Sequence, residues 1–247
     1  MKSVVIFILI GFLAQMIDGS LGMAYGVSCR TFLRTVAGVP SAVASAVIHI
    51  AEIPSSFFSG LSHFRIGNVN RDLLVRLMIP GIIGGVLGAW LLVDFGNKLE
   101  RIIDVYLIIM GVLILQRAIR GEWKRTGIGK FVYPVGFMGG FLDAVGGGGW
   151  GPLATSAMIA SGEDVKKSIG TVNAAEFLVT VAETTAFVAM MNDLFDYTEM
   201  ILGLVIGGVI AAPIAARVCS RLPERPLMAA VGILIIGLNI YNLIAWK

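Results

Sequence analysis

Long apolar stretches recur along the chain and exclude most folds that are stable in water. The clearest are Val4–Ile17, Ser41–Leu61, Leu77–Val93, Ile102–Gln116, Phe131–Leu142, Ala174–Met191, Met200–Val218 and Leu227–Trp246. Several have the roughly 20 residues with which a helix crosses a bilayer. Only 14% of the residues are charged, against about 25% in soluble domains. Because backbone groups in lipid must be paired within the protein, the sequence predicts an all-α integral membrane protein that crosses the cell membrane several times.

The two halves of the chain resemble each other. Residues 11–18 (GFLAQMID) align with residues 136–143 (GFMGGFLD), 125 positions later. Further pairs follow at offsets of 124, 123 and 121: His49-x-x-Glu52 with Asn173-x-x-Glu176, Gly84–Val86 with Gly207–Val209, and Gly111–Ile114 with Gly232–Ile235. These matches predict a first repeat over residues 1–120, a basic cytoplasmic linker over 121–130 and a second repeat over 131–247.

The placement of Lys and Arg predicts that the two repeats are inverted. If all eight apolar segments cross the membrane, the two sides carry 10 and 9 basic residues, which is no bias. If the first segment of each half is a re-entrant hairpin, the counts become 13 and 6, as the positive-inside tendency requires. Each half is then a re-entrant or broken helical hairpin followed by about three transmembrane helices. Inverted repeats with broken helices are an architecture of secondary transporters.

A glycine-rich break interrupts the first apolar segment of the second half. Gly146–Gly149 follow Asp143 and precede a Trp-Gly-Pro sequence at 150–152. Non-helical backbone at membrane depth persists only where protein buries it or where it lines a cavity. A helix that begins just after the break presents free N–H groups, which suit an anion. We therefore expect substrate to bind at helix N-termini behind two such hairpin tips, with close helix packing as the alternative role of the glycines.

Polar side chains and glycines near the two breaks form the predicted site. The residues expected to contact substrate are Gly19, Ser20, Gly22, Tyr25, Ser28, His49, Gly146, Gly147, Gly148, Gly149, Trp150, Thr155, Ser156 and Asn173. Arg30 and Arg34 are the basic residues nearest the first break, and we expect them to reach the membrane interface by snorkelling.

Five acids inside apolar sequence are expected to carry protons or to have structural roles. They are Asp18, Asp143, Glu52, Glu176 and Glu183. Asp18 and Asp143 are interpreted as caps of the hairpin tips, with proton coupling as the alternative. Glu52 and Glu176 either form interhelical hydrogen bonds or line a proton path. His49 with one neighbouring acid offers too few ligands for a metal, so neither a metal nor a cofactor is expected.

The duplicated motif resembles the TauE/SafE family of sulfite exporters, also called TSUP or DUF81. The first copy reads G-F-x-x-x-x-x-D-x-x-x-G and the second G-F-x-x-G-x-x-D-x-x-G-G-G-G-W-G-P. The resemblance implies alternating-access transport of a small sulfur-containing anion, such as sulfite or an organosulfonate, coupled to protons or to the membrane potential. It places the site region at Asp18, Gly19, Gly22, Tyr25, Asp143, Gly147, Trp150, Gly151 and Pro152. The first copy departs from the second over residues 20–23, where Ser-Leu-Gly-Met stands in place of Val-Gly-Gly-Gly.

Two other functions stay open at this point. The intramembrane carboxylates would suit a transporter of a cation such as a divalent metal, and a membrane enzyme is the less favoured alternative. The chain has no P-loop, HExxH, CxxC or nucleophile elbow and only two histidines, so no enzyme activity is expected. The expected partners are a small anion and the lipid bilayer and exclude nucleic acid, while the small-residue helix faces allow either a monomer or a homodimer.

Overall fold

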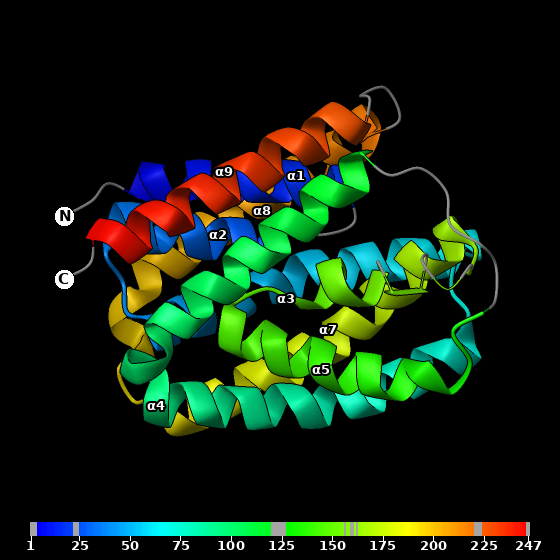
Figure 1. Ribbon diagram of the computed structural model, residues 1–247, viewed down its shortest axis with the longest axis horizontal. Helices are drawn as coiled ribbons and strands as arrows, with labels where there is room; N and C mark the ends of the chain where they lie inside the picture. Colours follow the sequence, from blue (N-terminus) through cyan, green and yellow to red (C-terminus); the bar gives the residue numbers. More distant parts are fainter. Residues whose placement is uncertain are drawn as a thin grey trace.

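A computed structural model describes residues 4–21, 25–119, 127–155, 157–158, 161, 163–219 and 224–245, and within them the chain is helical without strands (Figure 1). The all-α prediction is thus confirmed. The helices are α1 (Val4–Leu21), α2 (Tyr25–Phe32), α3 (Ser41–Ile66), α4 (Arg71–Ile119), α5 (Val132–Gly146), α7 (Val165–Met190), α8 (Thr198–Cys219) and α9 (Glu224–Ala245). Short helical segments are η1 (Leu33–Ala37), η2 (Gly129–Phe131), η3 (Gly151–Thr155) and η4 (Leu194–Tyr197). Residues 121–126 of the predicted linker lie outside the described residues.

Four stretches are long and apolar enough to cross a membrane: Ser41–Arg65, Arg71–Gly96, Lys167–Met190 and Leu194–Ala211. Large apolar side chains also cover outward faces, such as Ile79, Ile83 and Trp90 on α4, each about half exposed. Apolar patches on this scale are unfavourable in water but match a lipid environment. The chain is therefore an all-α membrane protein.

Figure 1 shows the two broken hairpins entering from opposite ends of the molecule. α1 begins at the end where α9 finishes, and α2 turns back toward that end. α5 begins at the opposite end, and η3 leads back toward it. The described parts of the basic junctions, at residues 65–71, 127–131, 163–167 and 217–219, also lie at this second end.

α4 differs from the expectation of two separate apolar helices. Its helical hydrogen bonding is continuous over 49 residues, and a straight helix of that length would measure about 74 Å, more than twice the roughly 30 Å of a bilayer core. Figure 1 shows that α4 turns back near its middle, so it supplies two arms. Gly84 and Gly88 in the first arm lie against Phe137 and Phe141 of α5. Gly111 in the second arm lies against Gly232 of α9.

The helix bounds refine the alignment of the two halves. α3 and α7 each have 26 residues and begin 124 positions apart, and α1 and α5 end 125 positions apart. α4 and α8, however, begin 127 positions apart. The contacts agree, because Gly11 lies against Leu204 and Gly136 lies against Leu77. The offset of 123 expected from the Gly-Gly-Val matches is therefore wrong by about one helical turn.

Arg34 is buried, which contradicts the expectation that it snorkels to the interface. Its Nη1 lies 2.8 Å from Oδ1 of Asp104 on α4, and both side chains are almost completely buried. Removing one member of such a pair leaves a buried charge without its partner.

Replacing Arg34 with Met is therefore expected to destabilise the protein by about 3 kcal/mol, and the double replacement Arg34→Met with Asp104→Leu should recover most of that loss. Thermal unfolding of the purified variants in one detergent measures both changes. If the double variant is as unstable as the single one, the loss comes from packing instead of from the uncompensated charge.

Candidate functional site

Asp143 caps the tip of the second hairpin. α5 ends at Gly146, Gly147 adopts a left-handed conformation with φ of 63°, and the N–H of Gly148 donates to the backbone carbonyl of Asp143 at 3.0 Å. The N–H groups of Gly149 and Trp150 donate to Oδ1 of Asp143 at 2.6 Å and 3.0 Å. These are the hydrogen bonds that a cap makes. The carboxylate thus accepts hydrogen bonds from two backbone N–H groups that were expected to face substrate.

Asp18 has the corresponding place in the first half. The backbone of Tyr25, where α2 begins, forms a hydrogen bond with its side chain. Tyr25 is the sequence counterpart of Trp150, whose N–H bonds to Asp143. Each broken hairpin therefore carries an acid that satisfies backbone donors at the start of the next helical segment.

The two glycine-rich breaks touch each other. Gly26 lies directly against the backbone of Gly147 and Gly148, and Gly148 lies against the backbone of Gly26 and Val27. Gly148 also has a φ of 148°, a backbone angle that residues other than glycine rarely adopt. At these positions the glycines allow two backbones to pack closely, which is the alternative role considered for them. This packing brings the tips of two hairpins from opposite ends into contact.

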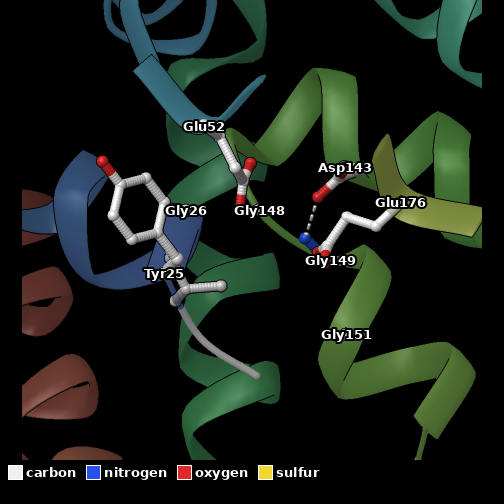
Figure 2. A pocket seen from close by; sticks show the side chains of 9 residues that line it. Tyr25, Gly26, Glu52, Asp143, Gly148, Gly149, Gly151 and Glu176 are labelled. Atoms are coloured by element: carbon white, nitrogen blue, oxygen red, sulfur yellow. Dashed lines mark hydrogen bonds between the residues drawn. The ribbon is translucent and has the colours of Figure 1, made fainter. Parts of the chain in front are cut away.

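A small pocket lies where the two breaks meet (Figure 2). Its lining residues are Tyr25, Gly26, Val27, Glu52, Asp143, Gly148, Gly149, Gly151 and Glu176. Figure 2 shows the side chains of Glu52 from α3 and Glu176 from α7 directed into this space. Both glutamates lie near the middle of stretches long enough to span a membrane. The pocket therefore combines exposed backbone with three carboxyl groups at membrane depth.

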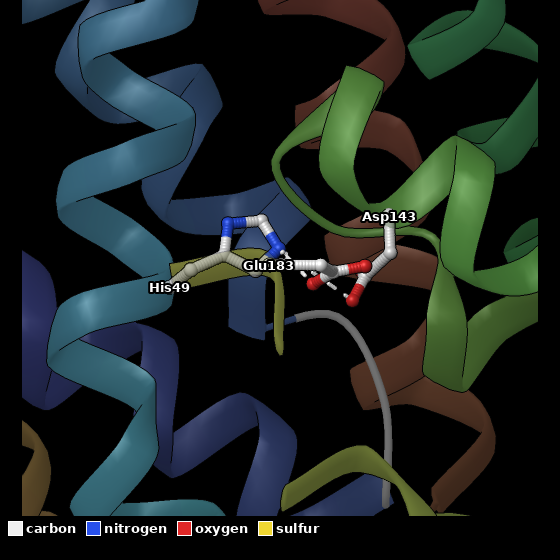
Figure 3. Close-up of side chains that lie close together, drawn as sticks. All are labelled: His49, Asp143 and Glu183. Carbon is white, nitrogen blue, oxygen red and sulfur yellow. Dashed lines mark ion pairs between the residues drawn. The ribbon is translucent and has the colours of Figure 1, made fainter. Parts of the chain in front are cut away.

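A second polar cluster, of His49, Asp143 and Glu183, lies beside the pocket (Figure 3). The three come from α3, α5 and α7. His49 Nε2 is 2.8 Å from Oε2 of Glu183 and 3.6 Å from Oδ2 of Asp143, and all three residues are buried. We call this group the His49 cluster. Asp143 belongs to both the pocket and the cluster, so it connects them.

The donor set of the His49 cluster fits a hydrogen-bonded network better than a metal centre. Its ligand atoms lie within 4.8 Å of one another. A metal such as zinc holds two ligand atoms about 3.3 Å apart, at bond lengths of about 2.0–2.2 Å to each. The distance of 2.8 Å between Nε2 of His49 and Oε2 of Glu183 is shorter than that separation and is that of a direct ion pair. The other oxygen of Asp143 is already engaged by two N–H groups.

Several residues predicted to bind substrate lie away from the pocket. Trp150 is buried with its indole N–H donating to the carbonyl of Val172 at 3.0 Å, so it anchors the hairpin to α7. Asn173 accepts a hydrogen bond from the hydroxyl of Ser59 at 2.9 Å. Five others among the described residues do not line the pocket, namely Ser28, His49, Gly146, Gly147 and Thr155. Gly22 and Ser156 lie outside the described residues, as do the surroundings of Gly19 and the side chain of Ser20.

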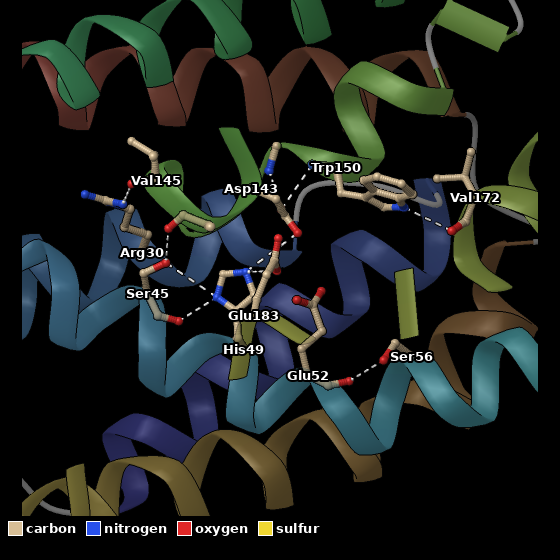
Figure 4. Close-up of polar contacts among 12 residues, drawn as sticks. Arg30, Ser45, His49, Glu52, Ser56, Asp143, Val145, Trp150, Val172 and Glu183 are labelled. Carbon is tan, nitrogen blue, oxygen red and sulfur yellow. Dashed lines mark hydrogen bonds and ion pairs between the residues drawn. The ribbon is translucent and has the colours of Figure 1, made fainter. Parts of the chain in front are cut away.

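Arg30 is fully buried beside the hairpin tip (Figure 4). The sequence did not indicate this position, because Arg30 was expected to snorkel to the membrane interface. Its Nη1 donates to the carbonyl of Val145 at 2.6 Å, and the hydroxyl of Ser45 donates to the carbonyl of Ala144 at 2.5 Å. Both carbonyls belong to the last turn of α5, where no later helical N–H is available. The break at Gly147 therefore creates the acceptors that hold Arg30 inside.

The comparison with known proteins agrees with this architecture. The family described as "Sulfite exporter TauE/SafE" matches residues 7–242. A relative from Bacillus subtilis (strain 168), "Probable membrane transporter protein YtnM", is 38% identical over 252 residues, which cover 99% of this chain and 84% of the relative. Both matches are to membrane transporters and not to enzymes. The chain belongs to the TauE/SafE sulfite exporter family.

Proposed function

We propose that the protein is a secondary transporter that moves a small sulfur-containing anion together with protons, by alternating access through the pocket between the two hairpin tips. The observation that carries this proposal is the pocket itself. It lies where two broken helices meet, and two matched glutamates, Glu52 and Glu176, line it. The family description names sulfite, so sulfite is the first substrate to test.

The carboxylates are the reason for including protons. Asp143, Glu52 and Glu176 line one small pocket, and three negative charges there would repel an anion strongly in a low-dielectric environment. If the two glutamates first bind protons, most of this repulsion is removed and their O–H groups become donors to the anion. Anion binding and proton binding are then linked, which is the requirement for coupled transport.

Alternating access in many transporter folds uses two repeats related by inversion, and we propose that residues 1–120 and 131–247 form such a pair. The contacts of matched residues support this relation. Gly111 and Gly232, which the sequence aligns with each other, also lie against each other. The pair His49 and Glu183 has its counterpart in Asn173 and Ser59, each residue being 124 positions from its match. Rocking of one half against the other would expose the pocket to either end in turn.

A cation transporter is the second candidate, because the same three carboxylates would attract a cation without any proton. The two proposals differ in what crosses the membrane. Purified protein in liposomes with an imposed proton gradient, acidic outside, is expected to accumulate labelled sulfite inside. Dissipating the gradient with a protonophore should abolish the accumulation.

The matched measurement uses labelled manganese or zinc in the same liposomes. Uptake of the metal with no uptake of sulfite would replace the anion proposal with the cation one. Sulfite uptake that follows the membrane potential alone, with no response to the pH gradient, would remove proton coupling from the proposal. Direction follows the imposed gradients, since a secondary transporter works both ways.

A further inference from the structure

We infer that His49 and Glu183 hold one exchangeable proton between them, at a site separate from the pocket glutamates, and that Asp143 connects this proton to the hairpin tip. The inference builds on the proposed function, because it assigns a second proton site to the same transporter. It arises from the contacts of the two nitrogens of His49, which fix how many protons the pair holds.

The first step fixes the tautomer of His49. Its Nδ1 lies 2.7 Å from the backbone carbonyl of Ser45 and 3.4 Å from the hydroxyl of Ser45. The carbonyl cannot donate, and the hydroxyl gives its hydrogen to the carbonyl of Ala144. Nδ1 therefore carries a hydrogen and donates it to Ser45 (Figure 4).

The second step concerns the other ring nitrogen. With the hydrogen of the neutral ring on Nδ1, Nε2 has only a lone pair, yet it lies 2.8 Å from Oε2 of Glu183. A neutral ring nitrogen and an ionised carboxylate oxygen repel each other at this distance, whereas a proton on either atom makes the contact attractive. The contact thus requires one further proton, either as imidazolium and carboxylate or as imidazole and carboxylic acid. In both forms the pair has bound one proton more than neutral His49 with ionised Glu183.

Asp143 gives this proton a connection to the hairpin. Its Oδ1 accepts the N–H groups of Gly149 and Trp150, while its Oδ2 faces Nε2 of His49 at 3.6 Å. When the pair loses its proton, Asp143 loses the positive or donating neighbour that compensates its charge. The same carboxylate holds the tip that touches Gly26, so the state of the pair biases the contact between the two hairpins.

The charged and titratable groups around the cluster come from every helix packed against it. Those that face His49, Glu183 or Asp143 are Asp18 on α1, Arg30 on α2, Glu52 on α3, Tyr106 on α4, and Glu176 on α7. Arg30 is the basic residue among them, and its Nη1 donates to the carbonyl of Val145 at 2.6 Å. His49 is the one member of the group that becomes positive on binding a proton, so the bound proton offsets negative charge on both neighbouring acids.

The repeat supplies an internal comparison. At the matched positions of the other half, Asn173 and Ser59 make a neutral hydrogen bond of 2.9 Å. That contact joins α3 to α7 with no titratable group. The replacement pair His49→Asn with Glu183→Ser therefore copies a contact that this fold already uses, and it leaves no titratable group in the pair.

The test observes the proton directly. The chain has two histidines, so protein carrying His63→Gln and labelled with ¹⁵N-histidine reports His49 alone. In this protein the Nε2 resonance is expected to move with pH or with addition of sulfite, while Nδ1 stays protonated. With Glu183→Gln added, the Nε2 resonance should stay that of a neutral ring throughout.

Three outcomes would overturn the inference. They are a resonance that ignores both pH and sulfite in the parent protein, an unchanged response after Glu183→Gln, and a response to one equivalent of zinc in place of protons. Transport gives an independent readout. His49→Asn with Glu183→Ser should lose at least half of the sulfite accumulation driven by the pH gradient. If wild-type protein carries no sulfite while the resonance titrates, the proposed function fails and the proton site stands.

Discussion

Replacing both Glu52 and Glu176 with Gln is expected to reduce sulfite accumulation driven by a pH gradient by at least about tenfold, the effect of about 1.4 kcal/mol in coupling. Glutamine has the size of a glutamic acid and can donate a hydrogen bond to an anion, but it carries no exchangeable proton. Binding of the anion should therefore persist, while the link between anion and proton is lost. Each single variant should have an intermediate effect, because the two glutamates occupy matched positions around one pocket.

The pH dependence of exchange distinguishes a proton carrier from a structural acid. In wild-type protein, exchange of sulfite should slow as pH rises, because the carboxyl groups ionise and repel the anion. In the double variant it should no longer change with the ionisation of these groups. Glu199→Gln is the control, since Glu199 is an exposed acid in the first turn of α8 and should leave transport unchanged. A double variant that still accumulates sulfite in a pH gradient as wild type does would move the coupling proton away from these residues.

The features that the sequence predicted well are those carried by local pattern. Apolar runs predict which segments form helices in lipid, and glycine-rich breaks predict where those helices are interrupted. The alignment of the two halves is enough to assign Glu52 and Glu176 to equivalent positions on α3 and α7. The cap at Asp143 was predictable for a similar reason, since an acid a few residues before free backbone N–H groups has a local partner.

The features that the sequence missed depend on contacts between distant segments. His49, Asp143 and Glu183 come from three helices, and their meeting follows from how α3 and α7 cross beside the end of α5. Arg30 was expected at the interface because a lone Arg in apolar sequence usually reaches for water. Its acceptor, the carbonyl of Val145, is available only because α5 stops at the break. The turn within α4 falls between two expected apolar segments, but the sequence did not indicate that helical hydrogen bonding continues through it.

Replacing Gly26 with Ala is expected to destabilise the protein by more than about 3 kcal/mol and to abolish transport. Gly26 lies inside α2 and has no unusual backbone angle, so alanine fits its conformation. The added methyl group, however, would meet the backbone of Gly147 and Gly148. Backbone atoms cannot move aside as a flexible side chain can, so the two hairpin tips would separate. Thermal unfolding in detergent and sulfite exchange in liposomes measure the two effects.

Gly237→Ala is the matched control, because Gly237 also lies within a helix, α9, and an added methyl group there meets nothing within 4 Å. Alanine favours a helix over glycine by about 1 kcal/mol, so this variant should be as stable as wild type or slightly more. The same gain applies at Gly26, which means that any net loss there underestimates the steric cost. If Gly26→Ala behaves like Gly237→Ala in both stability and transport, the two hairpin tips do not depend on this contact, and the pocket between them loses its role in the proposed transport.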